Sequence, residues 1–378
     1  MLRRFCMIKS VNTVFARALG ATYVVIWAYL GGFRGAFWRL RERLRERDAP
    51  GVPVTVVIPA RNEQQLVGRT VASLRAQRSD SSLRIVVADD ESSDSTGEVA
   101  RAAGANVVMR VGPRPPGWKG KLWAVAQAIG REPTDSKYFL LTDADIEYAS
   151  PLILSSLLAQ AGEGYDLVSV MVRLRCDSWA EKLLVPAFVF FFFKLYPPAW
   201  GTGAAGGCML IRGETLRAIG GIESIRDALI DDCALAERVR AARGRVWLGV
   251  SDLEIRSVRE YGSAREIRAM IARSAFAQLN HSTLLLIGTV LGMFVTYMAP
   301  IVLVFSGDRL AVGLGLAGWT ASAMLFLPTV RMYGAPIWTV LCLPFIAAFY
   351  LVATIESAIN YWTGRGGAWK GRVQDGKI

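Results

Sequence analysis

Acidic side chains follow three apolar runs that have the length and composition of β-strands. The runs span residues 54–60, 84–90 and 138–145, and segments with helical patterns separate them. Strands that alternate with helices form parallel sheets, whose carboxyl ends meet at one edge and line a ligand crevice. We therefore expect this crevice to collect several carboxylates. They are Glu63, Asp89, Asp90, Asp143 and Asp145.

Asp143 and Asp145 are separated by one residue at the end of the third run. Side chains at positions i and i+2 of a strand point to the same face, so both carboxylates can reach one metal ion. Crowded carboxylates raise one another's pKa, and a divalent cation relieves that repulsion. Mg²⁺ is commonly held by one or two carboxylates together with phosphate oxygens. The alternative is a pair of solvated acids in a turn.

A second acidic pair, Asp231-Asp232, precedes a segment with the pattern of an amphipathic helix. Carboxylates at a helix start ordinarily act as caps, and we expect one of the two to do so. The other could be a general base. His281 is the only histidine of the chain and lies at the edge of an apolar run. A single histidine excludes metal sites with several histidine ligands. Any nucleophilic catalysis that depends on histidine would have to use His281.

Other local signals define helix starts and loops. Ser95-x-x-Glu98 and Ser178-x-x-Glu181 have the form of capping boxes. Further strands are expected at 106–110 and Cys208–Arg212. The segment Gly201-Thr-Gly-Ala-Ala-Gly206 matches G-x-G-x-x-G, but it follows a Pro-Pro loop and opens no capped helix, so we do not expect a dinucleotide site.

The composition is too apolar for an ordinary soluble enzyme. Of 378 residues 52% are hydrophobic and 20% charged, which also excludes collagen, coiled coil and disorder. The net charge is +12, and residues 1–50 carry ten basic against three acidic side chains. Residues 51–282 are almost balanced, with 28 basic and 26 acidic side chains. Basic residues beside hydrophobic segments favour an anionic membrane surface, so no nucleic-acid partner is expected.

Long uncharged stretches predict membrane-spanning helices near the end of the chain. A span needs about 20 apolar residues, and we predict three at 283–305, 310–330 and 335–355. Near the beginning, Ala18–Phe33 provides 16 uncharged residues between Arg17 and Arg34. This stretch is short, but both arginines can extend to the interface, and we predict an uncleaved anchor. A secretory signal peptide is the alternative.

We divide the chain into an N-terminal anchor with a basic juxtamembrane segment (1–50), a globular domain (51–282), transmembrane helices (283–355) and a basic tail (356–378). Six arginines between residues 34 and 47 place the globular domain in the cytoplasm of a multi-pass inner-membrane protein. Three closing spans would leave Arg365, Lys370 and Arg372 of the tail on the far side. Either the tail breaks the positive-inside rule or one segment is not a full crossing.

Within the globular domain, Leu183–Phe193 is an uncharged run of 11 residues between Lys182 and Lys194. Such a run is too short to span a bilayer, so we expect residues 183–200 to lie in the membrane interface. A helix buried in the protein core is the alternative.

Five blocks of sequence occur in an order that resembles the family 2 glycosyltransferases of the GT-A fold. The resemblance covers roughly residues 53–250 and implies a Rossmann-like α/β domain with a mostly parallel sheet. The blocks are VTVVIPARNE, VVADDESSDST, LLTDADI, GGCMLIRGETLRAIGG and LIDDCALAERVRAARGRVWLG. Within the family, the segments 116–124 and 227–232, together with the membrane layout, are most similar to the hopanoid-biosynthesis-associated glycosyltransferases.

The resemblance implies a role for individual residues. Asp143 and Asp145 match the D-x-D that holds Mg²⁺ or Mn²⁺ against the donor diphosphate, with Asp145 the more direct ligand. Asp232 matches the catalytic base, and Asp231 is its acidic neighbour. Such enzymes invert the anomeric carbon in one displacement. Nucleotide-sugar binding is implied for Pro59, Ala60, Glu63, Asp90, Lys121, Asp143 and Arg273.

One departure from the family pattern bears on the product. Processive members carry Q-x-x-R-W before their closing spans, whereas the nearest stretch here, 271–276, keeps only Arg273. That arginine either meets the diphosphate or lies in the membrane interface. We therefore expect non-processive, metal-dependent transfer from a nucleotide sugar to a membrane lipid, with a hopanoid as the best candidate. The alternatives are a polyprenyl phosphate acceptor, which is already anionic and needs no base, and a degenerate domain that serves as a membrane scaffold.

Overall fold

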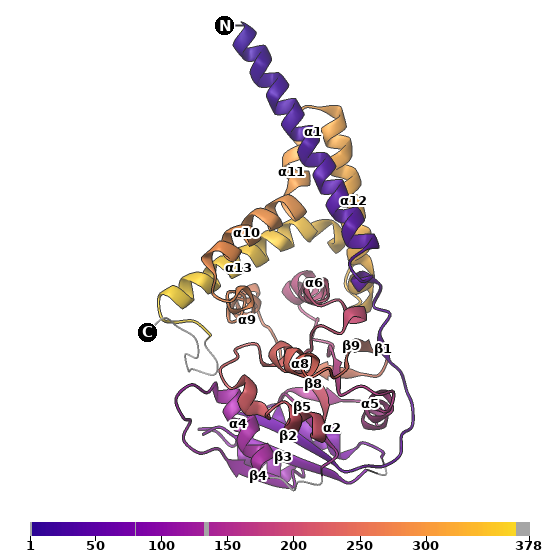
Figure 1. Cartoon of the computed structure of the whole chain (residues 1–378), viewed down its shortest axis with the longest axis vertical. Helices are drawn as coiled ribbons and strands as arrows, with labels where there is room; N and C mark the ends of the chain where they lie inside the picture. The colour runs from indigo at the N-terminus through magenta and orange to yellow at the C-terminus, as the bar shows by residue number, and fades with distance from the viewer. Residues whose placement is uncertain (1, 80, 132–135, 368–378) are drawn as a thin grey trace.

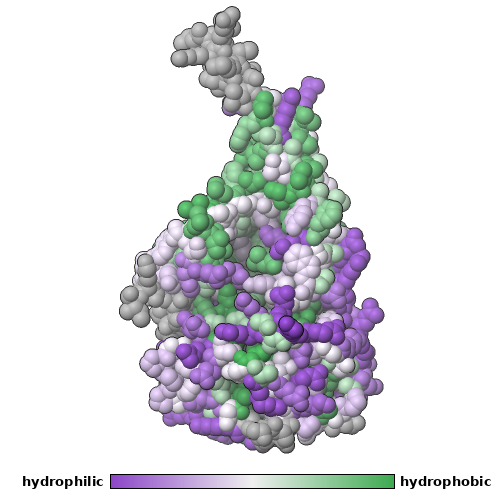
Figure 2. Space-filling view, in the orientation of Figure 1, coloured by the Kyte–Doolittle hydropathy of each residue, from purple (hydrophilic) through white to green (hydrophobic). Residues whose placement is uncertain are grey.

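The chain forms a sheet-containing domain at one end and a group of long apolar helices at the other (Figure 1). The computed structural model describes residues 2–79, 81–131 and 136–367. Hydrophobic side chains cover much of the visible surface of the helical end, and hydrophilic side chains cover the sheet end (Figure 2). Arg365 of the predicted tail is described, whereas Lys370 and Arg372 lie outside the described residues.

The central sheet has eight strands in the order β1-β9-β7-β8-β5-β2-β3-β4. β8 runs antiparallel to its neighbours β5 and β7, and all other neighbouring pairs are parallel. β6 (Ile146–Tyr148) and β10 (Ile255–Ser257) form a separate antiparallel pair. The strands of the large sheet are β1 (Arg43–Leu44), β2 (Val54–Ala60), β3 (Leu83–Asp89), β4 (Val107–Arg110), β5 (Tyr138–Thr142), β7 (Leu167–Val170), β8 (Cys208–Arg212) and β9 (Val246–Ser251).

The predicted α/β fold with a mostly parallel sheet is confirmed. β2 and β8 have the predicted bounds, and β3 begins and ends one residue earlier than expected. The predicted strand 138–145 is wrong in one respect, because it breaks after Thr142 and resumes as β6 at Ile146. Asp143 and Asp145 therefore lie in a turn between two strands, and the same-face argument for strand residues does not apply to them.

Helices cover both faces of the sheet and make every position of β2 buried. Successive strand residues enter separate cores, as the two-residue period of a strand requires. Val56 packs in the core that contains α2 and α5, and Val57 packs in the core that contains α4 and α8. The helices of this domain are α2 (Val67–Arg75), α3 (Thr96–Ala102), α4 (Gly120–Gly130), α5 (Ile153–Gly162), α7 (Gly213–Ala218) and α8 (Asp231–Ala241).

Five segments among the described residues are long and apolar enough to cross a membrane: 12–32, 179–200, 283–304, 309–332 and 337–362. Four of them correspond to the predicted anchor and closing spans. The helices of this end are α1 (Leu2–Gly32), α6 (Trp179–Leu195), α9 (Ala264–Ala272), α10 (Thr283–Met293), α11 (Ala299–Val304), α12 (Arg309–Met332) and α13 (Leu343–Trp362).

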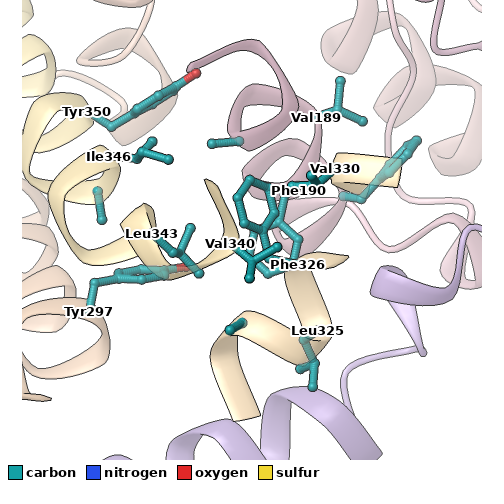
Figure 3. Close-up of a cluster of buried hydrophobic side chains, with 14 of the residues drawn as sticks. Val189, Phe190, Tyr297, Leu325, Phe326, Val330, Val340, Leu343, Ile346 and Tyr350 are labelled. Atoms are coloured by element: carbon teal, nitrogen blue, oxygen red, sulfur yellow. The ribbon is translucent and has the colours of Figure 1, made fainter. Parts of the chain in front are cut away.

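The fifth segment contains α6, which is longer than the predicted run of 11 residues. Its capping box is confirmed, because Ser178 Oγ accepts from the Glu181 N–H and the Glu181 carboxylate accepts from the Ser178 N–H. With the turn that follows, the segment reaches 22 residues, so the argument that it is too short to span is wrong. Half of it is nevertheless buried in the protein. Phe190 packs against Phe326 of α12, with ring centroids 5.1 Å apart (Figure 3).

The apolar helices do not all run in one direction. α1 and α12 follow the long axis of the molecule, whereas α10 and α13 cross it obliquely, and α13 ends on the side of the sheet domain (Figure 1). α1 and α12 approach closely at Gly318, where a Cβ atom would lie 2.4 Å from Tyr23. At the end away from the sheet, Arg17 forms an ion pair with Asp308 at 2.8 Å.

Candidate active site

The carboxyl edge of the central strands brings the sequence-predicted residues together. β2 lies between β3 and β5, and Ala60 at its end is in register with Asp89. The next residue of the neighbouring strand, Asp90, donates its N–H to the Ala60 carbonyl at 2.9 Å. Pro59 and Ala60 therefore lie at the same edge of the sheet as Asp90, where the crevice is expected; Asp90 is 3% exposed.

Lys121, at the start of α4, connects the two acidic pairs predicted from the sequence. Its Nζ lies 2.9 Å from Asp143 Oδ1 and 3.0 Å from Asp231 Oδ2. Burial opposes the charge of Lys121, but the two carboxylates outweigh it and raise the pKa of this lysine. Burial raises the pKa of Asp143, Lys121 opposes this rise, and Asp145 adds to it. The ammonium group of Lys121 thus links Asp143 of the D-x-D turn to Asp231 of α8 through two ion pairs.

Arg259 connects the other half of the crevice. Its Nη2 lies 2.6 Å from Glu63 Oε1, and its Nε lies 3.3 Å from Asp145 Oδ2. Ser257 Oγ donates to the same Asp145 oxygen at 2.6 Å. Because Ser257 ends β10, which pairs with β6, the small sheet fixes the orientation of Asp145. Glu63 and Asp145, which belong to different strand ends, are therefore joined through one guanidinium.

Asp232 lies at the start of α8 and is held by backbone groups. The Gly206 N–H donates to Asp232 Oδ2 at 2.8 Å, and the Cys233 N–H donates to Oδ1 at 2.7 Å. Burial, followed by the neighbouring charge of Asp231, raises the pKa of Asp232 to about 6, although Lys121 and the two N–H donors oppose the rise. A carboxylate with a pKa just below neutrality is ionised at pH 7 and basic enough to accept a proton.

Two arginines differ in how closely they approach this cluster. Arg61 Nη1 donates to the Asp90 carbonyl at 2.7 Å, and its buried Nε has no hydrogen-bond partner among the described residues. Arg273, at the end of α9, makes no ion pair within the described part of the chain. It faces the Tyr261 phenol, whose pKa is raised by burial and then by Asp145, and lowered by Arg259 and Arg273. Arg273 is therefore near the crevice without touching its acids.

The apolar end of the molecule reaches the same crevice through Tyr196, the residue that follows α6. Its hydroxyl accepts a hydrogen bond from Gln278 Nε2 at 2.6 Å and interacts with the thiol of Cys233, the neighbour of Asp232. The tyrosine ring also lies against Gly203, where a Cβ atom would come within 2.7 Å of it. Asp232 thus lies where the sheet domain meets α6.

The acidic residues fit a metal ion that arrives with phosphate ligands. No group of three or more His, Cys, Asp or Glu side chains within residues 2–79, 81–131 and 136–367 is arranged to hold a metal ion. Asp143 is engaged through Oδ1 and Asp145 through Oδ2. Within the described residues, Asp143 Oδ2 and Asp145 Oδ1 have no hydrogen-bond or ion-pair partner. Two carboxylates plus phosphate oxygens are a common Mg²⁺ environment.

Sequence reasoning missed five residues of the site: Ser257, Arg259, Gly206, Arg61 and Tyr196. No motif marks the first two, although a crevice with five predicted carboxylates required more cationic partners than Lys121. The sequence around Gly206 shows only a glycine motif. Its N–H contacts Asp232, and a Cβ atom at this position would lie 3.3 Å from the carboxylate, so the backbone approaches the acid closely.

Comparison with known proteins agrees with this architecture. The mannosyltransferase PcManGT from Pyrobaculum calidifontis, solved with GDP-Man and Mn²⁺, superposes with a TM-score of 0.55 and 18% identity over 91% of this chain and 98% of that one. The 4,4'-diaponeurosporenoate glycosyltransferase of Staphylococcus aureus is 33% identical over 107 residues. That match spans 28% of this chain and 28% of the relative, so about a quarter of each protein is compared.

The model of the Glycosyl transferase family 2 matches residues 55–220. These residues contain β2 to β8, including the D-x-D turn, and they end before α8 and the closing helices. Residues 55–220 are thus similar to the Glycosyl transferase family 2, and the PcManGT superposition shows that the chain has the GT-A fold.

Proposed function

We propose that this chain transfers one sugar from a nucleotide sugar to the hydroxyl group of a membrane lipid, with inversion at the anomeric carbon. The observation that carries the proposal is the position of Asp232. It is fixed by two backbone N–H groups, lies beside the D-x-D cluster through Asp231 and Lys121, and meets the end of α6 at Tyr196.

In this mechanism the Asp232 carboxylate accepts the proton of the acceptor hydroxyl. The acceptor oxygen forms a bond to the anomeric carbon, and the bond from that carbon to the nucleoside diphosphate breaks, with its electron pair leaving on the diphosphate. Asp90 and Arg61 border the nucleotide end of the crevice, and Lys121 orients Asp143 and Asp231. A divalent ion bound by Asp143 and Asp145 would neutralise the charge that develops on the leaving diphosphate.

The proposed lipid acceptor is supported by the surroundings of Asp232. α6 is apolar over most of its length, packs against α12, and ends at Tyr196 beside the base. The Staphylococcus aureus relative is named for a lipid acid, 4,4'-diaponeurosporenoate. A hopanoid is our specific candidate and rests on the resemblance described under Sequence analysis. Arg273 is too far from the acids to be a partner of theirs, and we propose that it meets the donor diphosphate.

The test uses the full chain in detergent, with Mn²⁺, a panel of nucleotide sugars and lipid extracts. We expect mass spectrometry to find lipids that have gained one sugar, and the largest signal from lipids with a free hydroxyl. Products on polyprenyl phosphate alone would replace the hydroxyl acceptor by a phosphate acceptor. Transfer to soluble sugars with no lipid product would contradict the proposal.

We further propose that α1 and α12 cross the inner membrane and that the sheet domain faces the cytoplasm. The uncharged parts of both helices lie between charged ends. Arg17, Asp308 and Arg309 lie at one end, and Arg34 and Arg331 lie at the other. The six arginines between residues 34 and 47 are on the sheet side, in agreement with the positive-inside rule. On this proposal α13, which runs obliquely to the long axis (Figure 1), is not a full crossing, and its end would lie on the cytoplasmic side, as the positive-inside rule expects for Arg365.

A cysteine at the exposed Ser82 tests this orientation. We expect a membrane-impermeant maleimide to label Ser82→Cys only after the membrane has been permeabilised. The same chain without this substitution gives the background from its own cysteines. Labelling of Ser82→Cys in intact cells would place the sheet domain outside the cytoplasm.

A further inference from the structure

A cavity of about 690 Å³ lies between the sheet domain and the apolar helices, away from the acidic crevice. Its walls come from the 3-10 turn that follows α1 (Phe37–Arg39), from the ends of β7 and β9, and from the last turn of α12. None of Asp143, Asp145, Asp231 and Asp232 lines it. It is therefore a second concave site, distinct from the candidate active site.

Four arginines line this cavity: Arg39, Arg43, Arg173 and Arg331. The lining also contains two acids, but each is already paired. Asp252 pairs with Arg43 at 2.5 Å, and Glu254 pairs with Arg256 at 2.6 Å. Within the described part of the chain, Arg39, Arg173 and Arg331 form no ion pair. The cavity thus carries an excess of positive charge, and both carboxylates of its lining are already paired.

Two of these arginines stack on aromatic rings. The Arg39 guanidinium lies 4.8 Å from the Trp38 ring centroid, and that of Arg173 lies 6.0 Å from the Tyr333 ring centroid. Stacking uses the face of a guanidinium and leaves the N–H groups at its edge available to an anion. Guanidinium edges match the oxygens of a phosphate group particularly well.

Apolar residues also form part of the cavity wall, which lies near the end of a proposed span. Leu40, Met171, Val250, Pro328 and Met332 contribute to the lining. α12 has 21 uncharged residues between Arg309 and Arg331, which at about 1.5 Å per residue match a hydrocarbon core of about 30 Å. Arg331 therefore falls at the level of the lipid headgroups on the side of the sheet domain.

We propose that this cavity binds the headgroup of an anionic phospholipid, with the phosphodiester between Arg39, Arg173 and Arg331 and the first part of an acyl chain along the apolar wall. The proposal rests on the membrane placement given under Proposed function, but not on the transfer reaction. The bound lipid is a structural ligand of the membrane leaflet and is not the sugar acceptor, because Asp232, the proposed base, does not line the cavity.

Native mass spectrometry of the full chain in detergent can measure this binding. Phosphatidylglycerol is compared with phosphatidylcholine, and a double variant, Arg173→Gln with Arg331→Gln, is compared with a control double variant, Arg41→Gln with Arg45→Gln. The control removes two exposed arginines of the same juxtamembrane region that do not line the cavity. We expect the wild type and the control to prefer phosphatidylglycerol, and the cavity variant to bind it at least about tenfold more weakly.

Three outcomes would overturn the proposal: unchanged phosphatidylglycerol binding in the cavity variant, an equal loss in both double variants, or displacement of the lipid by millimolar inorganic phosphate. Displacement by inorganic phosphate would indicate that the cavity binds a free anion. Thermal unfolding in neutral detergent checks that the cavity variant is folded. If this variant is unfolded, the double variant Arg173→Lys with Arg331→Lys replaces it and should retain part of the lipid binding. Should alkaline carbonate release the wild-type chain from membranes, the membrane placement itself would fail.

Discussion

Replacing Asp232 by asparagine is expected to lower turnover at least about 100-fold, the scale of losing a general base. The amide keeps the size of the side chain and can still accept the Cys233 N–H, but it cannot take a proton from the acceptor. Donor binding, measured by calorimetry with the nucleoside diphosphate, should stay near the wild-type value. Asp231→Asn is the matched comparison, because Asp231 pairs with Lys121 and lacks the two N–H contacts that fix Asp232.

A larger loss in Asp231→Asn would assign the base to that residue, and full activity in Asp232→Asn would favour an acceptor that is already ionised. Thermal unfolding checks that Asp232→Asn is folded. The pKa of Asp232 in the folded protein is raised to about 6. The folded protein therefore loses stability relative to the unfolded chain as the pH rises from the ordinary pKa of an aspartate to about 6. Removing the charge should therefore leave the unfolding temperature at pH 7 unchanged or higher.

The same shift predicts the pH dependence of the wild-type reaction. Below about pH 6 the Asp232 carboxyl becomes protonated and can no longer accept a proton. We expect kcat/KM to fall as the pH decreases through this value, and Asp232→Asn to lose this limb of the profile. A wild-type profile that stays flat down to pH 5 would contradict the assignment.

Asp145→Ala is expected to abolish most metal-dependent binding of the nucleoside diphosphate. The substitution leaves Asp143 as the only acid of the D-x-D turn, and Asp143 is already held by Lys121. Calorimetry with Mn²⁺ should detect tight binding in the wild type and weak binding in the variant. Excess chelator should reduce the wild type to the level of the variant.

Asp145 also receives Ser257 and Arg259, so its removal could disturb the small sheet. Asp145→Asn is the control, because the amide keeps the size of the side chain and can still accept from Ser257 while losing the negative charge. We expect it to bind the diphosphate almost as poorly as Asp145→Ala. If wild-type affinity is the same with and without chelator, the metal does not contribute to donor binding.

Much of the sheet domain could be predicted because its signals are local. The apolar runs gave the bounds of β2 and β8, and the Ser178 capping box marks the start of α6. A similar prediction at Ser95 is wrong, because its side chain makes no cap bond and Asp94 accepts the Thr96 N–H instead. The side chain that bonds to the start of this helix lies one residue before the pattern, and the S-x-x-E motif does not include it.

The parts that could not be predicted depend on contacts between distant segments. Arg259 lies 196 positions from Glu63, and no local pattern links these two residues. The split between β5 and β6 depends on β10, which pairs with β6 from more than 100 residues further along the chain. α6 is longer than the uncharged run because Lys182 and Lys194 lie within the helix and do not mark its boundaries. Lys194 remains inside the helix and donates to the Tyr297 hydroxyl at 2.7 Å.

The packing of α1 also determines the order in which the chain can fold. Tyr23 and Trp27 of α1 are completely or almost completely buried, and their partners come from the far end of the sequence. Trp27 donates to the Thr296 carbonyl at 2.9 Å, and Tyr23 packs on Gly318. During synthesis α1 leaves the ribosome first, but nearly 300 residues must follow before its packing surface is covered. On the proposed membrane placement, the anchor would wait in the bilayer with two aromatic side chains facing lipid, and a chain cut before residue 283 would keep them there.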